Sequence, residues 1–250
     1  PNPYCYAIEI CPIAESGFIR DAIEGFLMQK TAFPVEILIH DDASTDRTAD
    51  IVKEYEARYP KLFRCFYQPE NTYTKPNKHE LRIPFRNSCR GKYIAFCEGD
   101  DYWTDPLKLQ QQVDFLEANE DYAGCSHNTR MIYEDGSKED ALIVTSVIKD
   151  SYTIDDITKG QIYLHTSSMV YRNVFKSNFP KKYLTDYFGD WFLLMAYADV
   201  GPIKYIDSVM SVYRVVNNGI WSKLSAIEQI EQNLNALIVF NKVFEYKYEE

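Results

Sequence analysis

One stretch, Gly91-Lys-Tyr-Ile-Ala-Phe-Cys-Glu-Gly-Asp-Asp-Tyr-Trp-Thr-Asp-Pro-Leu-Lys-Leu109, passes from a short apolar run into three clustered carboxylates, those of Glu98, Asp100 and Asp101. The apolar run predicts a buried strand, and α/β folds place their chemistry at the carboxyl ends of strands. Because only Gly99 separates Glu98 from Asp100, both carboxylates can face one hard cation, Mg2+ or Mn2+. Such a cation completes its shell with water and substrate phosphates, so the stretch favours a nucleotide diphosphate as ligand.

Short apolar runs and helical patterns alternate through the first half of the chain. The expected strands cover residues 6–11, 35–40, 62–67 and 93–97, and apolar residues recur at helical spacing over 19–27 and 51–55. Alternation of this kind implies right-handed crossovers and a largely parallel sheet. The sequence therefore predicts an α/β fold with a Rossmann-like, mostly parallel central sheet flanked by helices.

Capping patterns predict where two helices of this half begin. Ser44 or Thr45 is expected to cap the helix that follows the second strand. Asp105 is expected to cap the helix after the carboxylates, with Pro106 at its first position.

The second half of the chain is less regular. Expected strands cover 122–127, 131–133 and 162–172, with a β-pair of 203–206 and 209–213, and expected helices cover 191–198 and the amphipathic stretch 226–244. The turn pair Asp135-Gly136 closes one strand, and the polar residues 137–160 predict a mobile loop over the site. We expect a smaller antiparallel part here, within a catalytic domain of residues 1–222, and a C-terminal helical segment, residues 223–250, packed on it.

Composition narrows the class of protein without identifying it. The 250 residues suffice for one α/β domain with a full core. Lysine and arginine total 27 against 37 acidic residues, and the net charge of −10 disfavours nucleic acid as a partner, because phosphate backbones bind cationic surfaces. Six scattered cysteines without a Cys-x-x-Cys pair favour free thiols in a reducing compartment. Because no apolar run approaches a membrane span and no signal-peptide pattern is visible, we expect a cytoplasmic protein.

The carboxylate stretch resembles the Asp-x-Asp region of glycosyltransferase family 2, nucleotide-sugar transferases of the GT-A fold. Three further motifs follow the family's order and spacing. Val35-Glu-Ile-Leu-Ile-His-Asp-Asp-Ala-Ser-Thr-Asp-Arg-Thr48 resembles its first strand, loop and helix, Gly189-Asp190-Trp191 the segment with its catalytic base, and Val212-Tyr213-Arg214 with Gly219-Ile-Trp-Ser222 its last motif. Because the motifs span most of the chain in order, the resemblance is specific.

The resemblance implies roles for individual residues. Asp100 would be the direct ligand of Mn2+ or Mg2+, and Asp190 the base that deprotonates the acceptor hydroxyl as it attacks the anomeric carbon. The residues implied in contacting the donor nucleotide are Pro12, Asp41, Asp42, Glu98, Asp101 and Arg214. Among them, Asp41 or Asp42 would accept a hydrogen bond from the base imide, a donor that uracil carries. Candidates on the acceptor side, in the smaller antiparallel part, are His127, His165 and Trp191.

Several of these residues also have a purely structural explanation. Asp41, Asp42 and Asp190 could cap helices, because backbone amides at a helix start favour a carboxylate. Arg214 could form a surface ion pair.

The chain departs from the family pattern at two places. Pro12-Ile-Ala-Glu-Ser16 replaces a loop whose tyrosine lies against the base, and Val215-Val-Asn-Asn218 replaces a stretch that often has a metal-binding histidine. A catalytically impaired nucleotide-sugar-binding or scaffold module is therefore the alternative to an active enzyme. A nucleotidyltransferase is a further alternative, but it would need a Gly-rich, basic phosphate loop early in the chain, and none is present.

The resemblance thus predicts an inverting, metal-dependent transferase that moves a sugar from a nucleotide-diphosphate donor, with a UDP sugar favoured, to a hydroxyl acceptor. One in-line displacement inverts the anomeric centre, so no covalent intermediate is needed. By family analogy the acceptor is a glycan or a lipid-linked molecule in bacterial surface polysaccharide or glycan synthesis. We expect no membrane span, and peripheral association with the inner face of the membrane is an alternative to a purely cytoplasmic location.

Overall fold

The computed structural model describes residues 4–10, 16–73, 75, 78–147, 149–175, 179–180, 183, 189–216, 219, 221 and 223–245, with the backbone alone for 4–10, 79, 80, 82, 83 and 86. Its elements in chain order are β1 (Tyr4–Ile10), α1 (Ile19–Leu27), β2 (Val35–Asp41), α2 (Thr48–Arg58), β3 (Phe63–Tyr67), α3 (Lys78–Asn87), β4 (Tyr93–Glu98), β5 (Tyr102–Trp103), α4 (Lys108–Ala118), β6 (Gly124–Tyr133), β7 (Ala141–Leu142), β8 (Ser151–Tyr152), α5 (Ile154–Thr158), η1 (Thr166–Ser168), β9 (Val170–Arg172), α6 (Asp190–Ala198), β10 (Ile203–Val215) and α7 (Ala226–Val243).

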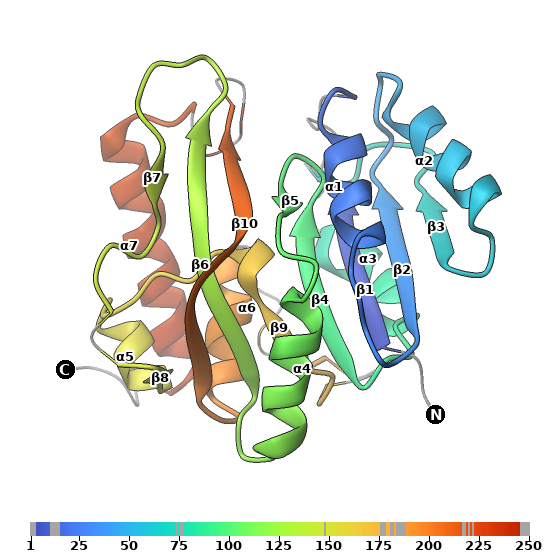
Figure 1. Cartoon of the computed structure of the whole chain (residues 1–250). Helices are drawn as coiled ribbons and strands as arrows, with labels where there is room; N and C mark the ends of the chain where they lie inside the picture. Colours follow the sequence, from blue (N-terminus) through green and yellow to red (C-terminus); the bar gives the residue numbers. More distant parts are fainter. Residues whose placement is uncertain are drawn as a thin grey trace.

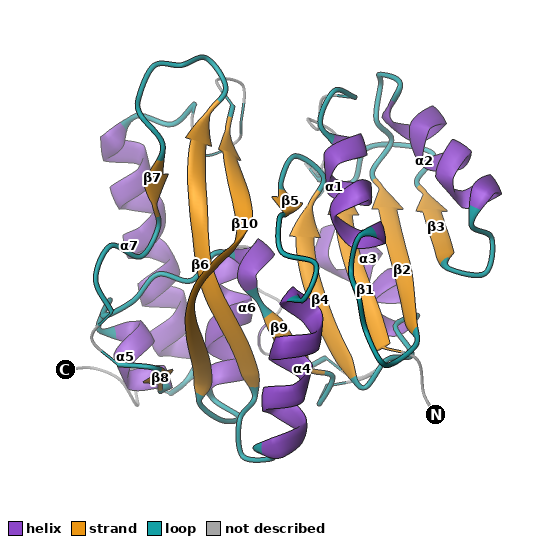
Figure 2. Ribbon diagram, in the orientation of Figure 1, coloured by secondary structure: helices purple, strands orange, loops and turns teal. Residues whose placement is uncertain are grey.

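The described strands form one sheet in the order β3-β2-β1-β4-β9-β6-β10-β5, with β7 beside β6 and β8 beside β10. The first four strands of this order are parallel to one another, and β6 and β10 are also parallel. β9 is antiparallel to both of its neighbours, β4 and β6, and joins the two parallel groups (Figure 2). The predicted fold class, a mostly parallel sheet flanked by helices with a smaller antiparallel part, is confirmed.

Successive residues of the central strands point to opposite faces of the sheet, and each face packs against its own apolar layer. Ile37 and Ile39 of β2 pack into the core that α1, α2 and α4 share, while Leu38 faces Phe85 of α3 on the opposite side of the sheet. A second core surrounds α6, whose residues from Phe192 to Ala198 are all buried. A helix that is apolar around its whole circumference has to be enclosed, and α6 lies behind β6 and β10 (Figure 1).

Both predicted helix starts are wrong by a few residues. α2 begins at Thr48 with Arg47 at the N-cap position, and the Thr48 amide donates to Asp46 at 2.9 Å. α4 begins at Lys108, and Asp105 instead accepts from the amide of Leu107 at 2.7 Å in the turn before the helix. In each case a carboxylate closes a tight turn ahead of the helix, a local bond that competes with capping.

The strands of the second half are longer or shorter than predicted. β6 runs without interruption through the expected break before Met131, and β10 is one strand rather than a β-pair, with register irregularities between Ile206 and Ser211. Bulges of this kind break the alternation of apolar residues without ending the strand. A strand prediction based on that alternation therefore places a break where the structure has none. The expected strand 162–172 shrinks to β9, preceded by the 3-10 turn η1.

Residues 137–160 are more ordered than the predicted loop. They contain β7, β8 and α5, and α5 begins with a capping box in which Thr153 and Asp156 bond reciprocally. Ile157 is fully buried in the second core, so this segment is part of the packed body. α3 was not predicted, and a helix with Pro84 inside it gives a weak sequence signal.

α7 matches the bounds of the predicted C-terminal helix within one residue at its end, but four of the apolar residues that defined its expected packed face, Ile227, Ile230, Leu234 and Ile238, are 55–70% exposed. Phe240 anchors it in the second core, together with Phe244 just beyond its end. The division into a domain of residues 1–222 and a segment of 223–250 stays a prediction. Among the residues that the structure describes, no helix is long and apolar enough to cross a membrane.

Candidate active site

The carboxyl ends of β1, β2 and β4 lie together at one edge of the sheet, the carboxyl edge. In the parallel register Ile10 of β1 lies beside Asp41 of β2, and Glu9 lies beside Glu98 of β4. The acidic residues that follow β2 and β4 are therefore brought to the same edge, as the sequence predicted, although their motifs are more than 50 residues apart.

The Asp41-Asp42 pair at the end of β2 is buried and already hydrogen-bonded. Asp41 accepts from the hydroxyl of Ser44, while Asp42 accepts from the Thr72 amide at 2.9 Å and from the Thr72 hydroxyl at 2.7 Å. Thr72 follows β3, so Asp42 connects two neighbouring loops at the carboxyl edge. No sequence pattern indicated Thr72, because only the parallel register of β2 and β3 brings it there.

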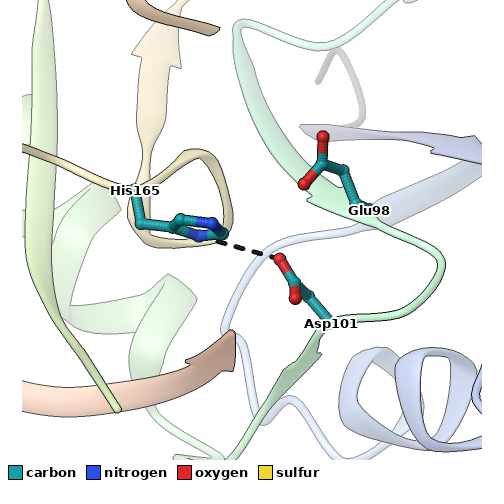
Figure 3. Close-up of side chains that lie close together, drawn as sticks. All are labelled: Glu98, Asp101 and His165. Carbon is teal, nitrogen blue, oxygen red and sulfur yellow. Dashed lines mark ion pairs between the residues drawn. The ribbon is translucent and has the colours of Figure 1, made fainter. Parts of the chain in front are cut away.

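Three side chains could hold a metal ion: Glu98 at the end of β4, Asp101 in the loop after it and His165 ahead of η1, a group that does not include the predicted ligand Asp100. Ligand atoms of Glu98, Asp101 and His165 all lie within 4.8 Å of one another, and Figure 3 shows the imidazole facing the two carboxylates. Asp101 is fully buried, its Oδ1 accepts from the backbone amide of Arg214 at 3.0 Å, and its Oδ2 has no hydrogen-bond partner among the described residues. A buried carboxylate oxygen without a donor fits a cation, because isolation from water is costly for an unpaired charge.

Burial and mutual repulsion act on these acids. Burial raises the pKa of Asp101 well above its usual range, and the charges of Asp100 and, more weakly, Asp190 act in the same direction. Burial also raises the pKa of Asp100, while the Arg214 charge partly offsets this. Asp190, at the start of α6, thus contributes to the electrostatics of Asp101.

Two neutral histidines accompany the acids. Burial lowers the pKa of His165 to about 3 and that of His127 well below its usual range. Nδ1 of His127 contacts the backbone oxygen of Asn128 at 2.7 Å, and its Nε2 has no hydrogen-bond partner in the described part of the chain. His165 lies at the acidic group, whereas His127 lies inside β6. Neutral imidazoles are the form that ligates metals.

Asp190 is exposed at the first position of α6 and follows Gly189, the N-cap residue, which makes no side-chain cap bond. A carboxylate that is exposed yet close to Asp101 is accessible to a substrate. Trp191 is half-buried against the second core, and a role for it on the acceptor side stays a prediction.

Arg214 is 6% exposed and surrounded by its own partners. Its guanidinium pairs with Asp21 at 2.5 Å and Glu134 at 2.9 Å, and lies 4.6 Å from the ring centroids of both Phe18 and Tyr102. The ion pair that was the alternative explanation for Arg214 is therefore present. The arginine of this pair is buried, however, and does not lie at the surface. A diphosphate contact would require these partners to release the guanidinium, and it stays a prediction. Pro12 lies outside the described residues.

The comparisons with known proteins identify the family of the chain. The model of glycosyl transferase family 2 matches residues 10–179. An uncharacterized protein of Mycobacterium tuberculosis, Rv1520, is 40% identical over 208 residues, covering 83% of this chain and 58% of its own length, so the chain spans little more than half of that relative.

Two solved structures share the fold. S. aureus TarS in complex with UDP-GlcNAc has a TM-score of 0.67 at 17% identity, covering 95% of this chain and 66% of its own. The mannosyltransferase PcManGT of Pyrobaculum calidifontis, in complex with GDP-Man and Mn2+, has a TM-score of 0.64 at 15% identity, covering 99% of this chain and 70% of its own. The family match spans most of the chain, and the chain therefore belongs to glycosyl transferase family 2.

Proposed function

We propose that the protein is an inverting, metal-dependent glycosyltransferase that uses a nucleotide-diphosphate sugar. The observation that supports this most is the meeting of Glu98, Asp101 and His165 at the carboxyl edge, where the charges of Asp100 and Asp190 also act on Asp101. A site with metal-binding acids and a separate, exposed carboxylate matches what an in-line sugar transfer requires.

Asp190 is the proposed base. A carboxylate is a weak base toward an alcohol, but the hydroxyl proton becomes acidic as the new C–O bond forms, so position matters more than a large resting pKa shift. The proton passes to Asp190, and the electron pair of the broken glycosidic bond leaves with the nucleotide diphosphate. With direct attack, the anomeric centre inverts.

Glu98 and Asp101 are the acids that would hold the metal. Bound there, Mn2+ or Mg2+ would supply positive charge to stabilise the departing diphosphate. Burial raises the pKa of Asp100 and of Asp101, and a bound cation would favour the charged forms of both carboxylates. We infer that Asp100 is a direct ligand, as the family pattern implies.

The proposed donor is a UDP sugar. TarS was solved with UDP-GlcNAc and PcManGT with GDP-Man, so the fold accommodates both nucleotides. A carboxylate of the Asp41-Asp42 pair can accept from the imide of uracil, which favours UDP. The acceptor is proposed to be a glycan or lipid-linked hydroxyl in surface polysaccharide synthesis, by family analogy alone, in the cytoplasm or at the inner face of the membrane.

Calorimetry with UDP in the presence and absence of Mn2+ tests the proposal. A transferase of this kind binds UDP with a large gain in affinity when Mn2+ is present, whereas a scaffold module gives no heat with either. GDP serves as the matched competitor, because it carries the same diphosphate on a different base. Metal-independent binding of UDP would contradict the proposed metal dependence.

A further inference from the structure

We propose that a groove beside β5 is a second saccharide-binding site, which holds part of an acceptor or product glycan away from the transfer centre. The groove has a volume of about 560 Å³ and is lined by residues in or next to β5, β6 and β10 and by Asp140 ahead of β7. This volume lies in the range of small-molecule sites, roughly 300–1,000 Å³. The choice of a saccharide as ligand rests on the proposed function, but none of the described lining residues is proposed to bind the metal or to act as the base.

The groove and the acidic group at His165 lie on opposite faces of β10. Val212 lines the groove. Its neighbour Ser211 accepts from the Ser167 hydroxyl at 3.0 Å. Its other neighbour, Tyr213, lies over His165 with a ring-centroid distance of 4.4 Å. Because successive side chains of a strand alternate between faces, β10 itself separates the two sites. An acceptor glycan is longer than its reacting sugar, so one face can hold the chain while the other carries out the transfer.

The walls of the groove are held in place by strand pairing. Tyr102 of β5 pairs with Val212 of β10, and the Thr104 amide donates to the Met210 oxygen at 2.9 Å. On the other side of β10, β6 pairs with β7 at Arg130. Figure 1 shows β5, β10, β6 and β7 side by side. The groove is thus formed before a ligand arrives, and binding does not need to order it.

Two charged groups at the rim of the groove are not engaged. Glu134 pairs with Nε of Arg214 at 2.9 Å, whereas the side chains of Arg130 and Asp140 make no hydrogen bond or ion pair within the described part of the chain. Both of these side chains are exposed. A guanidinium only donates hydrogen bonds and a carboxylate only accepts them. The groove therefore offers unused groups of both kinds to a ligand.

The lining favours a neutral ligand that is rich in hydroxyl groups. Ile132, Val209 and Val212 supply apolar surface, and the rings of Tyr102 and Tyr133 add to it. A sugar ring matches such a lining, because its C–H faces are apolar while the hydroxyls on its rim both donate and accept. Two carboxylates against one guanidinium disfavour a phosphate or a nucleotide, and a wholly apolar ligand would leave the polar groups without partners.

Saturation-transfer NMR of the full chain tests the inference, since a saccharide that binds receives magnetisation from the protein. The probes are trisaccharides of glucose, galactose, mannose and N-acetylglucosamine, measured in chelator without nucleotide. We expect at least one of them to bind to wild type. Its affinity should not change when Mn2+ and UDP are added, or in Asp190→Asn, because the groove lies on the other face of β10.

Tyr133→Ala removes an aromatic ring from the lining and should weaken this binding about 10-fold. Tyr67→Ala is the matched control and should leave the affinity unchanged. Tyr67 lies outside the groove at the end of β3, and a lysine lies 5.2 Å from its ring centroid, as one does at Tyr133.

A second variant guards against a failure of Tyr133→Ala to fold. Arg130 is exposed, so Arg130→Gln leaves the core intact while it removes the unpaired charge. This change should also weaken saccharide binding about 10-fold, the loss of one hydrogen bond from a charged donor.

The outcomes separate the inference from the proposed function. Failure of every trisaccharide to bind wild type, or equal affinity in wild type, Tyr133→Ala and Arg130→Gln, would overturn the groove as a saccharide site and leave the transferase proposal intact. Binding that requires Mn2+ and UDP would place the saccharide at the transfer centre and would overturn the inference as well. A protein that binds a trisaccharide in the groove but neither Mn2+ nor UDP would support the inference and overturn the proposed function.

Discussion

The two halves of the sheet differ in how far apart in sequence their bonded polar groups lie. In the first half, Asp41 bonds Ser44 three positions later and Asp42 bonds Thr72 across 30 positions. In the second half, partners are distant: Ser167 bonds Ser211 across 44 positions, and Arg214 bonds Asp101 across 113. The acidic motifs of the first half are therefore visible in the sequence, whereas the contacts that hold Asp42 and Asp101 form only once strands distant in sequence have paired.

The largest expected effect tests whether the second half supplies the chemistry. Asp190→Asn keeps the size of the side chain but removes its ability to accept a proton, so kcat should fall roughly 10²- to 10⁴-fold while donor affinity stays constant. Initial rates of nucleotide release and calorimetry of UDP binding give the two quantities. Asp190 is exposed at the start of α6, so a structural role would appear instead as a lower melting temperature with normal turnover per folded molecule.

The counterpart in the first half is Asp100. Asp100→Asn removes one anionic ligand from the end of β4 and should lower the transfer rate on the order of 10²-fold or more and abolish metal-dependent UDP binding, with the fold intact. Transfer rates over a series of Mn2+ concentrations measure it. Activity equal to wild type at every concentration would remove Asp100 from the metal site.

A smaller effect is expected at Asp42. Asp42→Ala should weaken UDP binding about 10-fold, the loss of one hydrogen bond to a charged group, without removing the dependence on metal. Thr72→Val is the matched control, because it deletes the hydroxyl that bonds Asp42 but leaves the carboxylate in place. An equal loss of affinity for inorganic diphosphate would show that Asp42 does not recognise the base.

The stability of the fold should depend on pH because of one buried lysine, Lys108. Lys108 is fully buried against Trp103 and donates to Gln112 at 2.8 Å, and burial lowers its pKa from 10.5 to about 7. At a pH between these two pKa values, the unfolded chain binds more protons at Lys108 than the folded chain does. The free energy of unfolding therefore rises with pH in this range, by at most about 1.4 kcal/mol per pH unit.

Lys108→Met keeps the approximate length of the side chain and removes the amino group that binds the proton. Urea unfolding at pH 7 and pH 9 should show a rise in the free energy of unfolding for wild type that is smaller or absent in the variant. The same rise in both proteins would mean that Lys108 remains protonated in the fold.

The sequence predicted the fold and the carboxyl edge because these depend on short-range patterns. The apolar run that ends at Glu98 and the acidic pair after β2 are visible without the structure, and parallel pairing brings them together. Helix starts were missed because Asp46 and Asp105 close turns rather than cap helices. The contacts around His165 and Thr72 could not be predicted from the sequence. Serine and threonine do not recur with a period that marks their partners, and those partners depend on the register of strands distant in sequence.

The most direct test of the account is turnover against a panel of UDP and GDP sugars, followed as nucleotide release with Mn2+ and with a chelator, for wild type and Asp190→Asn. We expect wild type to consume at least one nucleotide sugar, a UDP sugar by preference, only when metal is present, and Asp190→Asn to lose this turnover while still binding UDP. Nucleotide release that persists in Asp190→Asn, or in the chelator, would contradict a site formed by metal-binding acids from one half and a base from the other.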